Sequence, residues 1–505
     1  MSERERWVAD ATAGGMIPVV RECVLDADQP VALLAKLARG PFAFLLESAE
    51  GGERWARYTF LGTEPREAWR YRGRAVERWT PAGGWAPDGE TGDPIGHVGA
   101  RLRALPPRHG EEGGLPRFAG GAVGFFGYDV VRTLERLPSA PPADTDLPDA
   151  LVLLADAVVI LDNLTGRARV VVHAEVPAGA SPAARRAAWD AATARITDWS
   201  ARLARPHALP PLAPAHSPDD EPVATGPSPY PDAAFLRDVA VMKEHIARGD
   251  IFQGVLSRRV DVPGAVDPLA LYRCLRSINP APYLYYLRLG EFALVGSSPE
   301  VLVRVEDRDV TVRPIAGTRP RGRTPGEDAV LEADLLADPK ERAEHLMLVD
   351  LGRNDIGRVA AFGSVRVQEL MAVERYAHVQ HIVSEVRGTL APGLGAVDAL
   401  KACFPAGTVT GAPKVRAMEI LDRLEPVRRG PYAGAVGYLS WGATALDTAI
   451  AIRTCVVLPD RVLVQAGAGI VADSDPAREL IETQHKARAA LRAIAMARRG
   501  APPGR

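Results

Sequence analysis

Two predicted helices each carry a pair of glutamates three residues apart, Glu341 with Glu344 and Glu479 with Glu482. Each helix is expected to begin at an Asp-Pro pair, because Asp suits the N-cap and Pro suits the first helical position. A spacing of three places both carboxylates of a pair on one helix face. Two such pairs could together hold one Mg²⁺, which prefers carboxylate and water oxygens. Acidic side chains near a helix N-terminus are also favoured by the helix dipole, so capping explains either pair taken alone.

Two cations, Arg453 and Lys486, and two glycine-rich stretches could bind an anion. An arginine can hold a carboxylate through two parallel hydrogen bonds. The stretches GTVTGAPK (407–414) and AGAG (466–469) could present backbone N–H groups to a similar ligand. GTVTGAPK lacks the spacing of a phosphate-binding loop, and AGAG alone is a weak signal for a dinucleotide site. A tight turn explains each stretch taken singly.

His378 and His381 form an HxxH motif within YAHVQHIVSEV, whose β-branched residues predict a strand. Residues three apart on a strand point to opposite faces, so the two imidazoles are not expected to share a metal. Either could act as a catalytic acid or base, because imidazole titrates near neutral pH.

The elements that must position these side chains are predicted as runs of strands and runs of helices. The segments 151–162 and 167–176 flank NLTG and predict a hairpin. Four strands over 282–317 are expected to form a meander, helices follow, and three more strands lie within 432–471. Such runs favour an α+β fold with large antiparallel β-sheets covered by helices, rather than a doubly wound parallel sheet.

The composition is that of an ordinary soluble globular protein. The 505 residues include 61 basic and 63 acidic side chains, which leave a formal net charge of −2. This balance disfavours a polyanion-binding protein, so no nucleic acid partner is expected. Four widely spaced cysteines fit neither a disulfide framework nor a zinc site. No signal peptide or membrane span is apparent, and a cytoplasmic location is expected.

A Pro-rich segment, 205–231, divides the chain. It contains too little apolar material to form a core and is expected to run extended over the surface. It separates an N-terminal α+β part, 1–204, from a C-terminal part, 232–497, and the tail 498–505 is expected to fray.

Long motifs in the chain resemble those of the chorismate-utilising enzymes, and most closely those of anthranilate synthase component I. The resemblance covers essentially residues 40–495. Its motifs are GDIFQGVLSRR (249–259), GSSPE (296–300), PIAGTRPRG (314–322), ERAEHLMLVDLGRNDIGRV (341–359), HVQHIVSEVRG (378–388), FPAGTVTGAPKVRAME (404–419), GPYAGAVGY (430–438) and QAGAGIVADSDP (465–476).

The resemblance implies roles for individual residues. Glu344 and Glu482 are implied ligands of Mg²⁺, with Glu341 and Glu479 in the same shell or bridging through water. The residues implied to bind the two carboxylates of chorismate are Tyr432, Arg453, Gly467, Gly469, Lys486 and Gly317. Thr408 is implied to lie beside the ring, and His381 and Glu300 to serve proton transfer and pyruvate elimination. The chain would thereby be a catalytic α+β sandwich with its chorismate site in the C-terminal part.

Two positions choose among reactions within this family. Aminodeoxychorismate synthases carry a nucleophilic lysine where this chain has Ala316, and isochorismate and salicylate synthases carry a water-activating lysine where it has Gln253. The resemblance therefore implies direct attack by ammonia on chorismate, followed by loss of pyruvate to give anthranilate, the first step of tryptophan biosynthesis. Two alternatives remain: a 2-amino-2-deoxyisochorismate synthase that stops before pyruvate loss, and a non-catalytic tryptophan-sensing subunit.

The N-terminal half resembles the feedback region of anthranilate synthases. LLES (45–48), together with INPAPYLYYL (278–287), matches their tryptophan pocket. The residues implied to line it are Glu47 and Ser48 near the amino group, and Asn279, Pro280 and Tyr283 on the indole side. Ala281 and Ala449 replace the more usual Ser and Cys, and a plain turn at a sheet edge is the alternative interpretation of LLES.

No glutaminase domain is found in the chain. The resemblance therefore implies a hetero-oligomer in which a separate glutamine amidotransferase subunit supplies ammonia. Alone, the chain is expected to use free ammonium.

Overall fold

The computed structural model describes residues 2–48, 57–107, 114–207, 209–212, 225–376 and 379–500. The α-helices are α1 (Glu3–Asp10), α2 (Pro30–Leu37), α4 (Pro94–Arg103), α5 (Pro182–Leu203), α6 (Asp232–Ala247), α7 (Pro268–Ile278), α8 (Pro325–Ala337), α9 (Pro339–Gly357), α10 (Ala396–Cys403), α11 (Lys414–Leu424) and α12 (Pro476–Arg499). Short 3₁₀ turns are η1 (Ala11–Ala13), η2 (Tyr128–Thr133), η3 (Gly407–Val409) and η4 (Trp441–Ala443).

The first sheet has 11 antiparallel strands. In spatial order they are β1 (Gly15–Val24), β10 (Arg167–Val176), β9 (Ala157–Asp162), β3 (Tyr58–Thr63), β2 (Phe42–Glu47), β12 (Tyr283–Leu289), β13 (Ala293–Ser298), β22 (Thr454–Val457), β23 (Arg461–Ile470), β11 (Gln253–Pro263) and β19 (Gly411–Ala412). The predicted hairpin around NLTG is confirmed as β9 and β10, which pair with Asp162 opposite Arg167.

The second sheet has 12 strands, also antiparallel. In spatial order they are β16 (Ile315–Pro320), β18 (Val379–Thr389), β15 (Asp309–Val312), β14 (Val301–Glu306), β21 (Leu446–Ile450), β20 (Ala435–Ser440), β7 (Gly121–Phe126), β8 (Ala150–Ala155), β4 (Glu67–Arg72), β5 (Ala75–Thr80) and β6 (Gly84–Glu90), while β17 (Arg366–Arg375) pairs with the side of β18.

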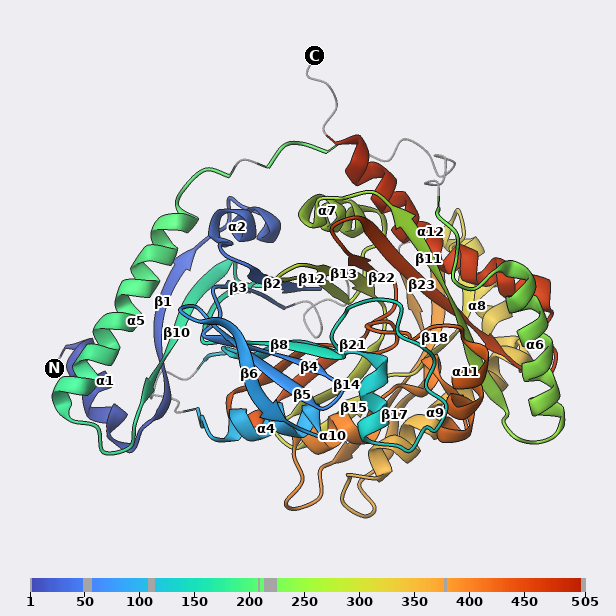
Figure 1. Cartoon of the computed structure of the whole chain (residues 1–505), viewed down its shortest axis with the longest axis horizontal. Coiled ribbons are helices and arrows are strands. Elements are labelled where there is room, and N and C mark those ends of the chain that lie inside the picture. The colour runs from blue at the N-terminus through green and yellow to red at the C-terminus, as the bar shows by residue number, and fades with distance from the viewer. Residues whose placement is uncertain are drawn as a thin grey trace.

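The two sheets pack face to face, and helices cover their outer faces (Figure 1). An aromatic-rich core that includes Phe44, Phe125 and Tyr285 lies between the sheets. A second core joins the outer face of the first sheet to α2, α5, α7 and α12, and a third joins the second sheet to α4, α9 and α10. Because burying one face of a sheet requires a covering layer, this four-layer arrangement confirms the predicted α+β class.

Both sheets contain strands from both sides of the Pro-rich segment. In the first sheet β2 pairs with β12, and in the second β7 pairs with β20. The described parts of 205–231 contain neither helix nor strand. The division of the chain into parts 1–204 and 232–497 stays a prediction. Each sheet combines strands from both parts.

The predicted meander over 282–317 is wrong in one respect. Strands β12 and β13 pair in the first sheet, whereas β14 and β15 pair in the second, so the chain changes sheets at Pro299–Glu300. The segment 444–457 is likewise divided between β21 in the second sheet and β22 in the first. Apolar alternation predicted these strands but carries no information on which sheet each joins.

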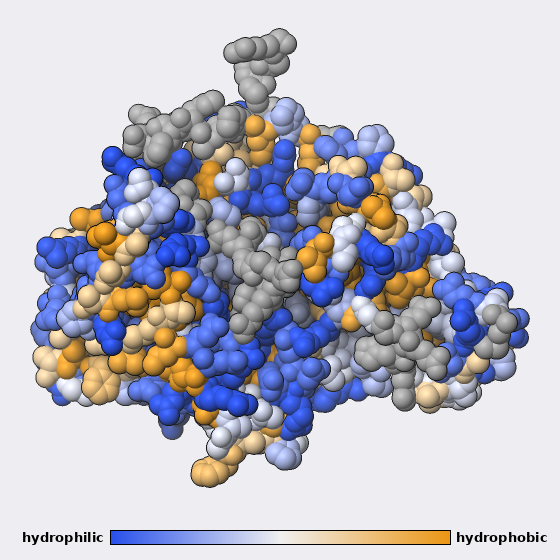
Figure 2. Space-filling model, turned by 180° about the vertical axis from the view of Figure 1, so that it is seen from behind, coloured by the Kyte–Doolittle hydropathy of each residue, from blue (hydrophilic) through white to orange (hydrophobic). Residues whose placement is uncertain are grey.

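Within the described residues, no helix is long and apolar enough to cross a membrane. Figure 2 shows one face of the molecule, on which apolar side chains occur in small groups among hydrophilic ones. Such scattered groups are normal for a protein surface and need no partner to explain them.

Candidate active site

The centre of the site is built where the chain passes twice from one sheet to the other. Glu300 lies on the link from β13 to β14, and Arg453 ends the link from β21 to β22. The two links lie side by side, because the Ile450 N–H donates to the Glu300 carbonyl at 3.0 Å and the Ser297 N–H donates to the Arg453 carbonyl at 3.2 Å. Residues 150 positions apart in sequence are thereby held together by backbone hydrogen bonds.

Glu300 is a buried carboxyl group that keeps its proton at neutral pH. Burial raises its pKa to about 8, although the Thr408 hydroxyl and the charges of Arg453 and Lys486 oppose the shift. Thr408 is supplied by the η3 turn, and the rest of GTVTGAPK runs through strand β19 to the start of α11. A carboxylic acid whose pKa lies near the working pH is suited to donate a proton.

Arg453 is a half-buried cation that makes no hydrogen bond or ion pair through its side chain with the residues the structure describes. Its backbone has a φ of 52°, a left-handed conformation that is uncommon for a residue with a side chain. Burial lowers the pKa of its guanidinium, while Tyr432, Glu482 and Glu300 act to raise that pKa. An unpaired, half-buried cation in a strained backbone indicates an anion-binding position.

The two glutamate pairs lie at the starts of α9 and α12, as predicted. Asp338 caps α9 by accepting from the N–H of Glu341, and Asp475 caps α12. Burial raises the pKa of Glu344, and the charges of Glu341 and Glu482 raise it further, so carboxylates of the two helices face one another.

The four glutamates nevertheless differ in their partners. Glu482 pairs with Lys486 at 2.6 Å, and Glu341 pairs with Arg319 at 3.3 Å. Burial also raises the pKa of Glu479. Within the described residues, no three His, Cys, Asp or Glu side chains gather into a ready-made metal site. The donors are all hard oxygens whose mutual repulsion a cation would relieve, which suits a Mg²⁺ that takes its other ligands from water and substrate.

AGAG lies inside strand β23 and not in a turn, so the tight-turn interpretation of this stretch is wrong. A Cβ on Gly467 would lie 2.8 Å from the Tyr432 hydroxyl, and one on Gly469 would lie 2.6 Å from Gln253 Nε2. The Lys486 ammonium donates to the Gly467 carbonyl at 3.0 Å. Glycine is required here because tyrosine, glutamine and lysine side chains converge on the strand surface.

His381 lies on β18, so the predicted strand is confirmed from Val379 onward; His378 lies outside the described residues. Its Nδ1 is 3.0 Å from the Gly317 carbonyl and 3.0 Å from the Thr318 hydroxyl. Burial lowers the pKa of the imidazole, so the ring is neutral at neutral pH. Since a carbonyl only accepts, Nδ1 carries the hydrogen and the Nε2 lone pair is left for a base.

Gln253 belongs to the site as well, although the sequence indicated it only as a position that separates subfamilies. Its Nε2 donates to Glu344 Oε1 at 3.4 Å, and its buried Oε1 has no hydrogen-bond partner in the described structure. Ala316 lies on β16, opposite Ile382 of the strand that carries His381.

A separate cavity of about 380 Å³ lies between the sheets beside LLES. Of the residues that the resemblance implied for a tryptophan pocket, Glu47, Ser48 and Tyr283 line this cavity, whereas Asn279 and Pro280 are not among its lining residues. Asn279 instead donates to the Ser297 hydroxyl at 3.2 Å. The remaining walls include Phe60, Phe118, Pro282, Arg304, Tyr438 and Asp447.

The Glu47 carboxylate already has partners at this cavity. It accepts hydrogen bonds from the Tyr272 hydroxyl and, at 2.7 Å, from Arg276 Nε, both on α7. At the other end of the cavity, the Tyr283 hydroxyl donates to Asp447 at 2.9 Å. The cavity is aromatic, with most of its charged groups paired.

Comparison with known proteins agrees with this geometry. A family profile of chorismate binding enzymes matches residues 75–492. This chain belongs to the chorismate-binding enzymes. Anthranilate synthase component 1 of Pseudomonas aeruginosa is 47% identical to this chain, over 98% of this chain and 99% of that protein. The protein of the same name in Aquifex aeolicus is 47% identical over 95% of both chains.

Solved structures show the same fold. Anthranilate synthase component I from Streptococcus pneumoniae superposes with a TM-score of 0.72 and 35% identity, over 86% of the enzyme and 92% of that chain. The menaquinone-specific isochorismate synthase from Escherichia coli has a TM-score of 0.69 at 21% identity over 96% and 97% of the two chains, a likeness of fold alone. The enzyme is therefore related over nearly its whole length to proteins named anthranilate synthase component 1.

Proposed function

We propose that the enzyme aminates chorismate with ammonia and then eliminates pyruvate to form anthranilate. The observation that carries the proposal is that the two sheet links hold a protonated Glu300 near Arg453, whose side chain has no partner among the described residues. A dianionic substrate that must lose a hydroxyl group needs such a pair: a cation to hold it and an acid to protonate the leaving oxygen.

Arg453, Tyr432 and Lys486 form the proposed anion-binding side of the site. Arg453 supplies a fork suited to a carboxylate, Tyr432 supplies a hydroxyl beside Gly467, and Lys486 lies against the same strand. Glycines at 467 and 469 leave room for the Tyr432 hydroxyl and the Gln253 amide to lie against the strand.

Glu300 and His381 have opposite proton roles in this proposal. Glu300 donates its proton to the hydroxyl that leaves the ring, with Thr408 beside it. His381, neutral and with Nε2 free, takes a proton from the ring during pyruvate loss, which restores aromaticity. Their pKa values are shifted in the directions that these roles require, upward for the acid and downward for the base.

Glu344 and Glu482 would hold a Mg²⁺ ion, with Glu341 and Glu479 nearby. When bound, the ion supplies positive charge to the ring carboxylate of the substrate. The raised pKa of Glu344, caused by burial and by the two neighbouring carboxylates, supports the assignment, because a cation would offset both effects.

Ammonia is the proposed nucleophile. Ala316 offers no nucleophilic side chain, and Gln253 cannot act as a base toward water because an amide does not titrate. The described part of the chain provides no second catalytic unit that would release ammonia from glutamine, and the relatives are named as a first component. We infer that a glutamine amidotransferase subunit supplies it in a hetero-oligomer.

The cavity beside LLES is the proposed site of tryptophan inhibition. Its aromatic walls and its volume suit an indole ring, and Ser48 and Tyr283 offer polar contacts. Because Glu47 is engaged by Tyr272 and Arg276, its part in recognition would be to orient α7 against β2 as much as to meet the amino group.

One assay tests the proposal. Purified enzyme is mixed with chorismate, Mg²⁺ and excess ammonium, and anthranilate fluorescence is followed with and without tryptophan. A signal that requires Mg²⁺ and falls with tryptophan supports reaction, metal and inhibition together. Loss of chorismate without fluorescence would instead indicate an enzyme that stops at 2-amino-2-deoxyisochorismate, and absence of Mg²⁺-dependent chorismate binding would indicate a tryptophan-sensing subunit.

The His381→Ala variant separates the two steps. If His381 serves only the elimination, the variant accumulates the amino intermediate while chorismate is consumed at a near-normal rate. Formation of anthranilate at the wild-type rate would remove His381 from the mechanism.

A further inference from the structure

Arg429, just beyond the end of α11, is a nearly inaccessible cation at the back of the site, with a side chain only 1% exposed. It donates to both carboxylate oxygens of Glu425, at 2.7 and 2.8 Å. It also donates to the carbonyls of Val409 and Val255, each at 2.7 Å. The guanidinium thus makes four hydrogen bonds, of which two are to backbone segments far apart in sequence.

The carbonyls bound by Arg429 belong to elements that carry site residues. Val409 directly follows Thr408 in η3, and Val255 lies two residues after Gln253 on β11. The guanidinium also lies 5.7 Å from the centre of the Tyr432 ring, within range for a cation–π contact. One side chain therefore contacts the residue that follows Thr408, the strand that carries Gln253, and the ring of Tyr432.

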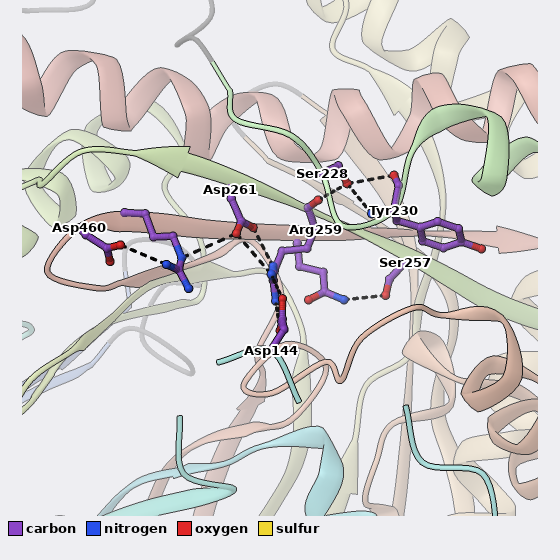
Figure 3. Close-up of polar contacts among 9 residues, drawn as sticks. Asp144, Ser228, Tyr230, Ser257, Arg259, Asp261 and Asp460 are labelled. Atoms are coloured by element: carbon purple, nitrogen blue, oxygen red, sulfur yellow. Dashed lines mark hydrogen bonds and ion pairs between the residues drawn. The ribbon is translucent and has the colours of Figure 1, made fainter. Parts of the chain in front are cut away.

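Glu425 extends this contact along β11. Its Oε1 accepts from the N–H and the hydroxyl of Ser257 at 2.9 and 2.8 Å. Gln465 of β23, the strand that carries Gly467, donates in turn to the Ser257 hydroxyl at 2.9 Å, and Figure 3 shows the Ser257 end of this contact. The ion pair is consequently tied to both strands that form the floor of the site.

Strand β11 also carries Arg259, a buried arginine whose side chain makes no hydrogen bond to a site residue among the residues that the structure describes. Arg259 pairs with Asp144 and Asp261, and Figure 3 shows the three together with Asp460 at the hairpin end of the network. Its partners are acids of a loop and of its own strand. Arg259 resembles Arg429 because it is buried and pairs with carboxylates. It differs from Arg429 because its side-chain hydrogen bonds go to acidic side chains and not to the backbone of η3 and β11.

We propose that Arg429, fixed by Glu425, is a positioning residue that sets Thr408, Tyr432 and the Gln253 end of β11 at their working distances from one another. The inference rests on the proposed reaction. A lysine at this position would keep the charge but could not span a carboxylate and two carbonyls, because its donors radiate from a single nitrogen. Small displacements of groups around a reacting molecule are costly, on the order of 100-fold in rate for about 1 Å.

The experiment compares Arg429→Lys with Arg259→Lys in the full-length enzyme. For Arg429→Lys we expect kcat/KM for chorismate to fall on the order of 100-fold, with KM raised through Tyr432 and kcat lowered through Thr408. For Arg259→Lys we expect a lower Tm, with kcat and KM within about threefold of wild type. Equal kinetic constants for the two variants would overturn the proposal.

A double-mutant cycle distinguishes positioning from plain stabilisation. Arg429→Lys is combined with Thr408→Ala, and the loss in kcat for the double variant should be far smaller than the product of the single losses, because both changes disturb the same group. Losses that multiply would show that Arg429 does not act through Thr408, and the proposal would fail.

Glu425→Gln serves if Arg429→Lys does not fold. It keeps the size of the side chain but removes the charge that orients Arg429. We therefore expect KM to rise and kcat to fall as in Arg429→Lys, but by smaller factors. Unchanged kinetics in Glu425→Gln would contradict the proposal. If the wild-type enzyme does not turn over chorismate, the proposed function is wrong and this inference fails with it. If the wild-type enzyme is active and the variants have unchanged kinetic constants, only this inference is wrong.

Discussion

Glu300 and Arg453 at the catalytic centre and the charged groups of the cavity beside LLES differ in their partners. In the centre, Arg453 has no partner among the described residues and Glu300 is kept protonated by burial. In the cavity, Glu47 is held by Tyr272 and Arg276, and Asp447 by Tyr283. Burial also raises the pKa of Asp447 in the cavity, so the catalytic centre is set apart by the open hydrogen-bonding positions of Arg453 and not by a shifted pKa alone. A cavity whose charges are already paired is suited to bind a ligand without reacting with it.

The difference between the catalytic centre and the cavity is tested most strongly by a substitution of Glu300. Glu300→Gln keeps the size of the side chain but cannot donate an acidic proton, so we expect kcat to fall about 10²–10⁴-fold. Anthranilate formation under saturating chorismate and ammonium measures the effect. Tryptophan binding, followed by calorimetry, should stay unchanged, and a variant with wild-type kcat would show that another group supplies the proton.

The pH profile provides a second measurement at Glu300. An acid with a pKa raised to about 8 is protonated below that pH and loses its proton above it. At constant free ammonia, kcat/KM for chorismate should hold from neutral pH to about pH 8 and decline at higher pH, whereas protonation of His381 lowers it at acid pH. The residual activity of Glu300→Gln should lack this decline; a decline that persists in the variant would assign it to a different group.

At Arg453 we expect a smaller loss. Arg453→Lys keeps a positive charge but removes the fork that binds a carboxylate at two points, which is worth about 1.5–3 kcal/mol. The corresponding loss in kcat/KM for chorismate is about 10–100-fold, measured by steady-state kinetics, with most of it in KM. An unchanged KM would place the carboxylate elsewhere.

In the cavity the expected effect is on inhibition and not on rate. Ser48→Phe places an aromatic ring in the space proposed for tryptophan, so the inhibition constant should rise at least about tenfold while kcat stays within about twofold. Inhibition curves and kcat measured on one preparation decide this. Full sensitivity in the variant would place the inhibitor site outside this cavity.

The smallest effect is expected at Tyr283. Tyr283→Phe removes the hydrogen bond to Asp447 and leaves that buried carboxyl with one donor fewer, which should cost about 1–3 kcal/mol in the free energy of unfolding. Thermal denaturation measures the stability, and the inhibition constant should shift only a few-fold. A large loss of kcat would show that the two regions are less separate than their charges indicate.

Local features of the fold could be predicted from the sequence because they depend on neighbouring residues. The Asp-Pro pairs predicted where α9 and α12 begin, and β-branched runs predicted β18 and the β9–β10 hairpin. Residue type alone indicated Arg453 and His381 as candidates, whereas the implied role of Glu300 came only from the family resemblance, since no local pattern indicated it.

Features that depend on the partner of a strand could not be predicted in this way. In the sequence, the links at Pro299–Glu300 and before Arg453 resemble ordinary breaks between strands. The strands on both sides of the first link were therefore expected to form one meander. Arg429 and Glu425 are four residues apart, a spacing that would equally suit a surface ion pair. Only the packing of β11, η3 and Tyr432 around them shows that this pair is buried.

Because each sheet is completed by strands from both sides of the Pro-rich segment, neither side can be a finished body alone. Separated from the other, residues 1–204 would expose the open edges of β2 and β7, and residues 232–497 those of β12 and β20. Open edges of long apolar strands recruit other chains. A cut within 205–231 should therefore leave a two-piece molecule that stays assembled, whereas each piece produced by itself should aggregate.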